Sequence, residues 1–380
     1  PGARNWGQTN WPKRPACRPA SRPATGGPIP EFFTGERLWA KDKTWSSSCL
    51  SRFGICWAPT RWRANGLPDP VRWADLADPR LRGQLALADP TKSGSVARAF
   101  ELIIQAEIQR SLQAPERAAL PEKDRLALGW ADGFRLVQRM SANARYFSDS
   151  STKIPLDVAD GNAVAGMCVD YYGAAFAHQV NRPNDVRLIW TAPAGGTTVS
   201  GDPIGVLRGA PEQELAQAFV EFVLSPAGQS LWSSPVGAPH GPRDRELFRP
   251  PVRRDTYATL PPERAALSPY VGTDHLQYRP ELTAASFGTI RRAVRVMCID
   301  THEELKEAWA EIIKAGMPAD ALAVMGDVSA LPYRAGGEGD PGLESRDALV
   351  SARRMTELGA IFRENYRRAA ELARQHQEKR

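Results

Sequence analysis

Short apolar runs alternate with longer segments of helical period along much of the chain. Residues 85–88 form a compact apolar run, and the polar turn 89–95 follows it. From Val96 to Ile108, apolar residues then recur every three or four positions, as on the buried face of a helix. A strand, a glycine-containing turn and a helix are the building step of an α/β domain, so this pattern predicts an α/β fold.

The same step recurs further along the chain. Apolar runs at 164–169 and 187–190 each lead into a polar stretch, and residues 51–57 predict a short buried strand before them. Between the apolar runs at 85–88 and 164–169, the helical period predicts two further helices, over about 120–142 and 155–163.

The C-terminal half has mainly the helical period. Pro211 is expected to open a helix carrying Leu215, Phe219 and Phe222, which Pro226 ends. A capping box at 301–304 predicts the start of another helix, with a glycine at 316 just past its end. The last helix is expected to bury one apolar face, made of Leu358, Ile361, Phe362, Tyr366 and Ala369.

Composition sets the scale and excludes some classes. A chain of 380 residues suits two lobes, and 42% hydrophobic with 24% charged residues is the balance of a globular protein. The sequence contains no apolar stretch of about 18 residues, the length that would predict a membrane-spanning helix. The net charge of +6 comes from scattered residues without a nucleic-acid-binding motif, so we expect no nucleic-acid partner. Residues 1–30, rich in Pro and Arg, are expected to be disordered or foreign to the fold.

The turn after the first apolar run is the sharpest candidate site. Thr91, Ser93, Gly94 and Ser95 lie where a strand gives way to a helix, whose first N–H groups lack internal partners. Glycine lets a ligand approach the backbone, and the hydroxyls add donors, so an oxyanion could bind there. An ordinary capped helix start explains the same residues equally well.

A second group of candidates follows the later runs. Asp170, Tyr171 and Tyr172 are expected at the carboxyl end of a buried strand, where ligands of α/β sheets collect. The tyrosines could bind an anion, a sugar or ferric iron, or simply pack against a neighbouring lobe. Two polar turns could add hydroxyls to the same cleft or be plain loops; their candidate residues are Ser151, Thr152, Thr197 and Thr198.

No catalytic set assembles from the sequence. The histidines lack HExxH or HxH spacing, and no GxSxG motif is present. The five cysteines are odd in number and widely spaced, which favours isolated buried thiols over a metal cluster; they are Cys17, Cys49, Cys56, Cys168 and Cys298.

Several stretches, taken in order, resemble one known family. They are residues 31–39, 53–56, 73–79, 83–95, 165–173, 202–211 and 219–232. Together they resemble the extracellular solute-binding proteins of ABC importers, in the ferric-iron and AfuA-like branch. The resemblance implies a type II periplasmic-binding-protein-like bilobal α/β fold with a helical C-terminus, which closes over its ligand like a hinge.

The family template implies a division of the chain. Residues 1–30 would be a non-native lead, 31–75 a hinge-crossing segment, and 76–190 the second α/β lobe. Residues 191–380 would return to the first lobe and form the C-terminal helices. Family members carry a signal peptide and a further half-lobe, so we expect the first lobe to be incomplete here.

The resemblance also implies roles for the candidate residues. Thr91, Ser93, Gly94 and Ser95 match the anion-facing loop, and the tyrosines at 171 and 172 match phenolate ligands of ferric iron. The other iron ligands would lie in the absent half-lobe, so we expect no metal and no cofactor. The resemblance thus implies a monomeric periplasmic protein that captures a small anionic solute, a phosphate-bearing organic compound or a ferric complex. It would deliver this solute to an ABC permease; a phosphate-binding transferase on the same fold, or an incomplete fragment, are the alternatives.

Overall fold

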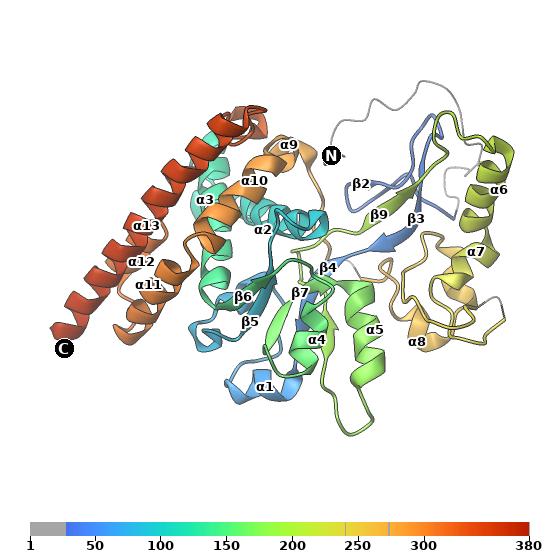
Figure 1. Ribbon diagram of the computed structural model, residues 1–380, viewed down its shortest axis with the longest axis horizontal. Helices are drawn as coiled ribbons and strands as arrows, with labels where there is room; N and C mark the ends of the chain where they lie inside the picture. The colour runs from blue at the N-terminus through green and yellow to red at the C-terminus, as the bar shows by residue number, and fades with distance from the viewer. Residues whose placement is uncertain (1–27, 240, 273, 380) are drawn as a thin grey trace. The chain divides into compact units, whose positions relative to one another are not determined.

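The computed structural model describes residues 28–239, 241–272 and 274–379, which form two compact units (Figure 1). Unit 1 comprises the described residues of 1–51 and 199–272, and unit 2 those of 52–198 and 273–380. Cys17, and all but residues 28–30 of the segment expected to be disordered or foreign to the fold, lie outside the described residues. The template assigned 191–380 to the first lobe and the C-terminal helices. In the structure, the described residues after 273 cluster with 52–198.

A five-stranded sheet is the centre of unit 2. Its order is β6-β5-β7-β4-β8, where β5 (Leu85–Ala88) runs parallel to β6 (Ala144–Ser148) and β7 (Ala165–Val169). β4 (Phe53–Trp57) is antiparallel to both β7 and β8 (Ile189–Thr191), so β8 runs in the same direction as β7. Every residue of β4, β5 and β7 is buried, which explains their continuous apolar sequences.

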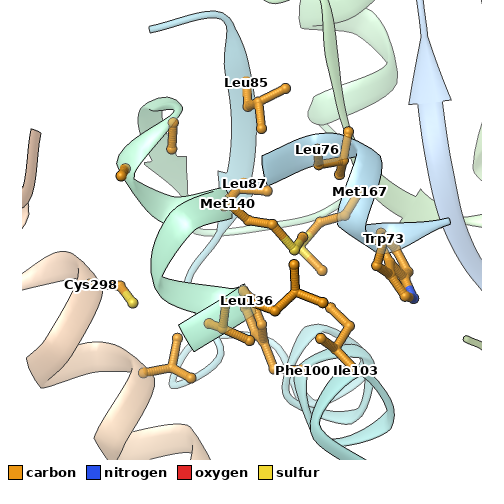
Figure 2. Close-up of a cluster of buried hydrophobic side chains, with 14 of the residues drawn as sticks. Trp73, Leu76, Leu85, Leu87, Phe100, Ile103, Leu136, Met140, Met167 and Cys298 are labelled. Atoms are coloured by element: carbon orange, nitrogen blue, oxygen red, sulfur yellow. The ribbon is translucent and has the colours of Figure 1, made fainter. Parts of the chain in front are cut away.

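Helices of unit 2 follow these strands. They are α1 (Pro59–Ala64), α2 (Gly94–Gln113), α3 (Glu122–Ala142), α4 (Ile154–Ala159) and α5 (Asp170–Val180). The helices predicted after 95 and over about 120–142 are confirmed, whereas the one predicted over 155–163 ends at Ala159. Figure 2 shows the apolar core, where Met140 and Leu136 of α3 approach Phe100 of α2 and Met167 of β7.

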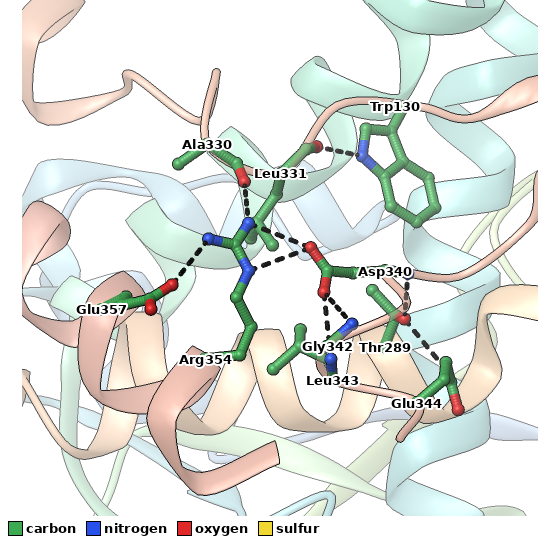
Figure 3. Close-up of polar contacts among 10 residues, drawn as sticks. All are labelled: Trp130, Thr289, Ala330, Leu331, Asp340, Gly342, Leu343, Glu344, Arg354 and Glu357. Atoms are coloured by element: carbon green, nitrogen blue, oxygen red, sulfur yellow. Dashed lines mark hydrogen bonds and ion pairs between the residues drawn. The ribbon is translucent and has the colours of Figure 1, made fainter. Parts of the chain in front are cut away.

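The C-terminal helices pack on the same core. They are α9 (Pro280–Thr283), α10 (Phe287–Val294), a π-helical turn (Arg295–Ile299), α11 (His302–Lys314), α12 (Ala319–Met325) and α13 (Ala348–Glu378). The Trp309 indole of α11 donates to Asn143 Oδ1 at 2.7 Å. Arg354 of α13 donates to Asp340 at 2.9 Å and to the Ala330 carbonyl at 3.0 Å (Figure 3). These contacts fasten the long α13 to the chain that precedes it.

Two details of these helices were predicted wrongly. Thr301 is the N-cap residue of α11, as predicted, but it makes no side-chain capping bond: its hydroxyl donates to the carbonyls of Val296 and Met297, which the π-helical turn brings within reach. Ile361 is exposed rather than buried with Leu358, Phe362, Tyr366 and Ala369, because it lies at the edge of the apolar stripe of α13.

Unit 1 is built from short strands and helices. Its elements are β1 (Phe32–Phe33), β2 (Glu36–Arg37), β3 (Ser46–Ser51), β9 (Ser200–Ile204), α6 (Gln213–Leu224), α7 (Pro226–Leu231) and α8 (Pro262–Ala265). β1 pairs with β2, and β3 pairs with β9. The strand predicted over 51–57 is confirmed as β4, which begins at Phe53; Ser51 instead ends β3, and the chain passes from unit 1 to unit 2 at Arg52. Among the described residues, no helix is long and apolar enough to cross a membrane.

Candidate functional site

The sheet of unit 2 gathers the candidate residues at one edge. β5, β6, β7 and β8 share one direction, so the segments that follow them all leave from the carboxyl edge of the sheet. These four segments contain every predicted site residue: 91–95, 151–152, 170–172 and 197–198. Ligands of α/β sheets bind at such an edge. The topology therefore places the candidates in one region, and the contacts of each residue decide what it can do there.

The turn before α2 combines both functions that the sequence allowed. Ser93 is the N-cap of α2, and its hydroxyl accepts the Val96 N–H at 3.5 Å. The same Ser93 Oγ lies 3.1 Å from Ser95 Oγ. Gly94 and Ser95 are exposed, and a Cβ built on Gly94 would meet no atom within 4 Å. The space beside Gly94 is thus open, next to the two serine hydroxyls, and hydroxyls and the N–H groups of a helix start are donors that an oxyanion can accept.

Thr91 has a different role from the serines. Its hydroxyl donates to Asp89 Oδ1 at 2.6 Å, and its N–H donates to the same oxygen at 2.8 Å. These two bonds fix the turn that leads from β5 to Ser93. Thr91 is therefore better described as a residue that shapes the turn than as a ligand donor.

Two arginines beyond the predicted site reach this turn. Arg291 of α10 donates from Nε to the Pro90 carbonyl at 3.0 Å and from Nη2 to the Thr91 carbonyl at 3.2 Å. Arg295, in the π-helical turn, forms an ion pair with the buried carboxylate of Asp89. Arg291 bonds neutral carbonyls and pairs with no carboxylate of the described chain, so its positive charge adds to that of the helix start. Sequence reasoning missed both, because only the fold brings residues 200 positions apart together.

Asp170 directly follows the carboxyl end of the buried strand β7, as predicted, and is the first residue of α5. Its carboxylate accepts the Tyr171 N–H at 2.9 Å and the Arg52 Nε–H at 3.3 Å. The residue is only 5% exposed, and burial raises the pKa of its carboxyl while the Arg52 charge opposes that shift. These contacts make Asp170 part of a buried ion pair that holds α5, rather than a group offered to a ligand.

Tyr171 and Tyr172 follow in the same helical turn. Their ring centroids lie 4.5 Å apart at an interplanar angle of 61°, and both side chains are half-buried. A Cβ on Gly173 would come within 2.5 Å of the Trp190 ring, so glycine is needed for α5 to approach β8 this closely. Close packing therefore fixes the start of α5, and with it the position of both phenol rings.

The two remaining candidate turns are largely satisfied by their own chain. Ser150 Oγ lies 2.9 Å from Thr152 Oγ1, and Ser151 is buried. Thr197 and Thr198 are also buried, and the Thr197 carbonyl accepts the Leu276 N–H at 3.0 Å. These observations are typical of structural loops, and a ligand role for the four residues stays a prediction.

Metal and thiol chemistry has little support in the described residues. No group of three or more His, Cys, Asp or Glu side chains in this part of the chain could hold a metal ion. The described cysteines are free and buried. Burial raises the pKa of Cys49 and of Cys298 to about 12, so these thiols stay protonated and unreactive.

Comparison with known proteins gives the family. The family described as bacterial extracellular solute-binding protein matches residues 31–253, more than half of the chain. The chain belongs to this family. The match covers the turn before α2, both tyrosines and the whole of α6, but not the C-terminal helices that carry Arg291 and Arg295.

Individual members of the solute-binding family are distant in sequence. The phosphoglycerate transport regulatory protein PgtC of Salmonella typhimurium is 25% identical over 182 residues, which are 48% of this chain and 39% of PgtC. The putrescine/agmatine-binding protein of Pseudomonas aeruginosa is 27% identical over 139 residues, 33% of this chain and 37% of that protein. The chain thus spans about two fifths of the length of the curated relatives that it matches.

Solved structures agree on the fold. The apo ferric ion-binding protein A of Pasteurella haemolytica superposes with a TM-score of 0.50 at 12% identity, over 73% of each chain. The periplasmic binding protein AfuA of Actinobacillus pleuropneumoniae gives a TM-score of 0.49 at 19% identity, over 76% of this chain and 73% of that one. The predicted type II periplasmic-binding-protein-like α/β fold with a helical C-terminus is confirmed.

Proposed function

We propose that this solute-binding protein captures a small anionic solute at the carboxyl edge of the unit 2 sheet and delivers it to an ABC permease. One observation carries the proposal: open space faces the start of α2, where N–H groups and the hydroxyls of Ser93 and Ser95 converge. The uncompensated charge of Arg291 beside the turn favours an anion further. The protein would act in the periplasm as a monomer.

An organic phosphate fits the site better than a ferric complex. The turn offers neutral N–H and O–H donors, which suit the several acceptor oxygens of a phosphate. Tyr171 and Tyr172 are the predicted phenolate ligands, and their rings pack edge to face against each other. The name of the PgtC relative, a phosphoglycerate transport protein, supports the same choice.

The proposed work is binding, not catalysis. A transporter component needs only different affinities for its solute in its different states, and no bond has to be made or broken. The hydrogen-bonding groups at the turn are suited to this, and the nearby Asp89 carboxylate is already held by Thr91 and Arg295. We therefore propose that the protein is not an enzyme.

A thermal-shift screen of the purified chain tests the proposal. The ligands are inorganic phosphate, 3-phosphoglycerate, fructose 6-phosphate, ferric citrate and putrescine, each over a range of concentrations. A ligand at a hundred times its Kd should stabilise the fold by about 2.7 kcal/mol, which such an assay detects. Stabilisation by phosphate esters alone would support the proposal, and stabilisation by putrescine or ferric citrate alone would refute the phosphate assignment.

Substitutions then place the ligand at the turn. Ser93→Ala with Ser95→Ala should weaken the binding of the phosphate ester by about 1–3 kcal/mol, because two hydroxyl donors to the anion are lost. Calorimetric titration measures this loss. Ser225→Ala is the matched control: Ser225 caps α7 in unit 1, accepting the Gly228 N–H at 3.1 Å, so it removes a comparable cap away from the site. Equal affinities in both variants would exclude the turn before α2 from the site.

A further inference from the structure

The turn before α2 is organised around one buried residue, Asp89. Its carbonyl accepts the N–H groups of Lys92 at 3.1 Å and of Ser93 at 3.2 Å, and its Oδ1 accepts both hydrogen bonds from Thr91. Asp89 is only 3% exposed, and a charge buried in this way needs a partner. The group that holds this carboxylate therefore also holds the backbone that leads to Ser93.

The partner of Asp89 comes from the C-terminal part of the chain. Arg295 donates from Nη1 to Asp89 Oδ2. One helical turn earlier, Arg291 donates to the carbonyls of Pro90 at 3.0 Å and of Thr91 at 3.2 Å. Residues four positions apart lie on the same face of a helix, so both guanidinium groups reach the turn together. We call Arg291 and Arg295 the arginine clamp.

A π-helical turn, Arg295–Ile299, fixes one end of the clamp. The Asp300 N–H donates to the Arg295 carbonyl at 2.9 Å, and Arg295 Nε donates to Asp300 Oδ1 at 2.7 Å. The fully buried Tyr366 of α13 donates to the Met297 carbonyl at 2.8 Å, which fastens the π-helical turn to the core. Such turns are rare and often occur at functional sites. Arg295 is thus held through its backbone and its side chain alike.

The charge of Asp89 matters for any anion that binds at the turn. The carbonyl of Asp89 bonds the Ser93 N–H, so a negative carboxylate lies close to the proposed ligand. Like charges repel strongly where little water separates them. Arg295 offsets this carboxylate, and Arg291 adds positive charge, since it bonds two neutral carbonyls. Without Arg295, the turn would present the anion with an uncompensated negative charge.

We propose that the arginine clamp positions the anion-binding turn. Arg291 and Arg295 hold its backbone, and Arg295 also offsets the charge of Asp89 that would otherwise repel the solute. Both arginines act through the turn, so they are positioning residues. They lie outside residues 31–253, so the family match does not imply this role. The inference rests on the proposed function for its ligand, whereas its structural part concerns the turn alone.

Amide hydrogen exchange of the full chain without ligand tests the structural part. The amides to follow are those of residues 91–93, which all bond to Asp89. Arg295→Gln should speed their exchange at least about tenfold, because the turn loses the partner of its central carboxylate and opens more often. Arg295→Lys should restore most of the protection, since the contact with Asp89 uses a single nitrogen and lysine keeps the charge.

Two further variants control this measurement. Arg117→Gln removes an arginine that pairs with Asp132 at 2.7 Å and is 26% exposed, against 33% for Arg295, but lies beyond the far end of α2. It should leave the exchange of 91–93 unchanged. Arg291→Gln leaves no buried charge unpaired, so it should fold even if Arg295→Gln does not, and it should also speed this exchange. Wild-type exchange rates in Arg291→Gln and in a folded Arg295→Gln would overturn the proposal.

Calorimetric titration with 3-phosphoglycerate tests the electrostatic part. Arg295→Gln should weaken binding at least about tenfold, because the charge of Asp89 then repels the anion. Adding Asp89→Asn to Arg295→Gln should recover most of this loss, since the asparagine Oδ1 can still accept the hydrogen bonds from Thr91. A purely structural contribution would instead make the double variant weaker than Arg295→Gln, which would refute the electrostatic part.

The two measurements separate this inference from the proposed function. If the wild type binds neither 3-phosphoglycerate nor inorganic phosphate, the proposed function fails, and the exchange of residues 91–93 alone decides whether the arginine clamp positions the turn. If the wild type binds 3-phosphoglycerate and Arg295→Gln binds it equally well, the proposed function stands and the inference is wrong.

Discussion

Individual hydroxyl and carboxylate groups of the candidate site differ in what they have left to offer a ligand. The hydroxyl of Thr91 is engaged by Asp89, and the carboxylate of Asp170 by Arg52. Ser93 and Ser95 lie beside open space instead. Residue type alone made these groups equivalent in the sequence. Their hydrogen-bond partners separate the residues that shape the turn from those that can bind an anion.

His302 gives a prediction at the residue scale. Its Nε2 lies 3.1 Å from the Ser141 carbonyl, and its ring meets Phe147 edge-on at 5.2 Å. Burial lowers the pKa of the imidazole from its ordinary value of 6.5; the nearby Lys306 lowers it further, and Glu303 opposes this. Below pH 6.5 the unfolded chain therefore binds a proton more readily than the folded chain. The free energy of unfolding should decrease as the pH is lowered through this range.

Urea unfolding between pH 5 and 8 measures this effect. We expect the wild-type midpoint to be level above pH 6.5 and to fall below it until the lowered pKa is reached. His302→Gln should flatten this part of the profile, whereas His376→Gln, at an exposed histidine of α13, should leave the fall in place. Identical profiles for wild type and His302→Gln would contradict the assignment.

At the scale of elements, the buried face of a helix makes most of the helix's contribution to the free energy of unfolding. Phe362 and Ile361 are adjacent in α13, yet Phe362 is fully buried and stacks on Tyr366 with ring centroids 6.3 Å apart. Phe362→Ala should lower the free energy of unfolding by about 3–5 kcal/mol, because it removes a buried ring and leaves a cavity. Ile361→Ala, at a 40% exposed position, should cost much less. Chemical denaturation measures both, and equal losses would show that α13 packs in another register.

The apolar period predicted the main elements but not which face or sheet each one joins. β5, β7, α2 and α3 follow directly from the sequence pattern. The start of α5 did not, because no glycine or proline separates Asp170 and the two tyrosines from the apolar run of β7. For α6 the pattern predicted the helix but not which face it buries, and Leu215, Phe219 and Phe222 are exposed.

The site shows the same division between local and long-range information. Ser93 and its neighbours were predicted because a strand, a turn and a helix start are adjacent in sequence. Arg291 and Arg295 were missed, because their approach to Pro90 and Asp89 depends on how α10 packs against α2. A residue that acts through tertiary packing leaves no local sequence signal.

At the scale of the whole molecule, the chain passes between its two units three times, near residues 51, 198 and 272. The sequence-based boundaries did not follow these passages. The apolar pattern of residues 51–57 predicts a single strand, because nothing in it indicates that the chain changes sheet at Arg52. Which sheet a strand joins is decided by distant partners: β9 for β3, and β7 with β8 for β4.

The two units should therefore unfold separately. The core of unit 2 combines its sheet with helices from both of its chain segments, 52–198 and 273–380. The apolar cluster of unit 1 has seven buried side chains, and Leu215, Phe219 and Phe222 of its helix α6 are exposed. Stability scales with buried apolar area, and elements with little of it open first. We expect two calorimetric transitions, with unit 1 at the lower temperature. Leu50→Ala in unit 1 should lower only the first midpoint, and Leu87→Ala in unit 2 only the second, each by the equivalent of about 2–5 kcal/mol. A single transition that both variants shift alike would mean that the two units unfold as one cooperative body. The small core of unit 1 would then not make this unit unfold at a lower temperature than unit 2.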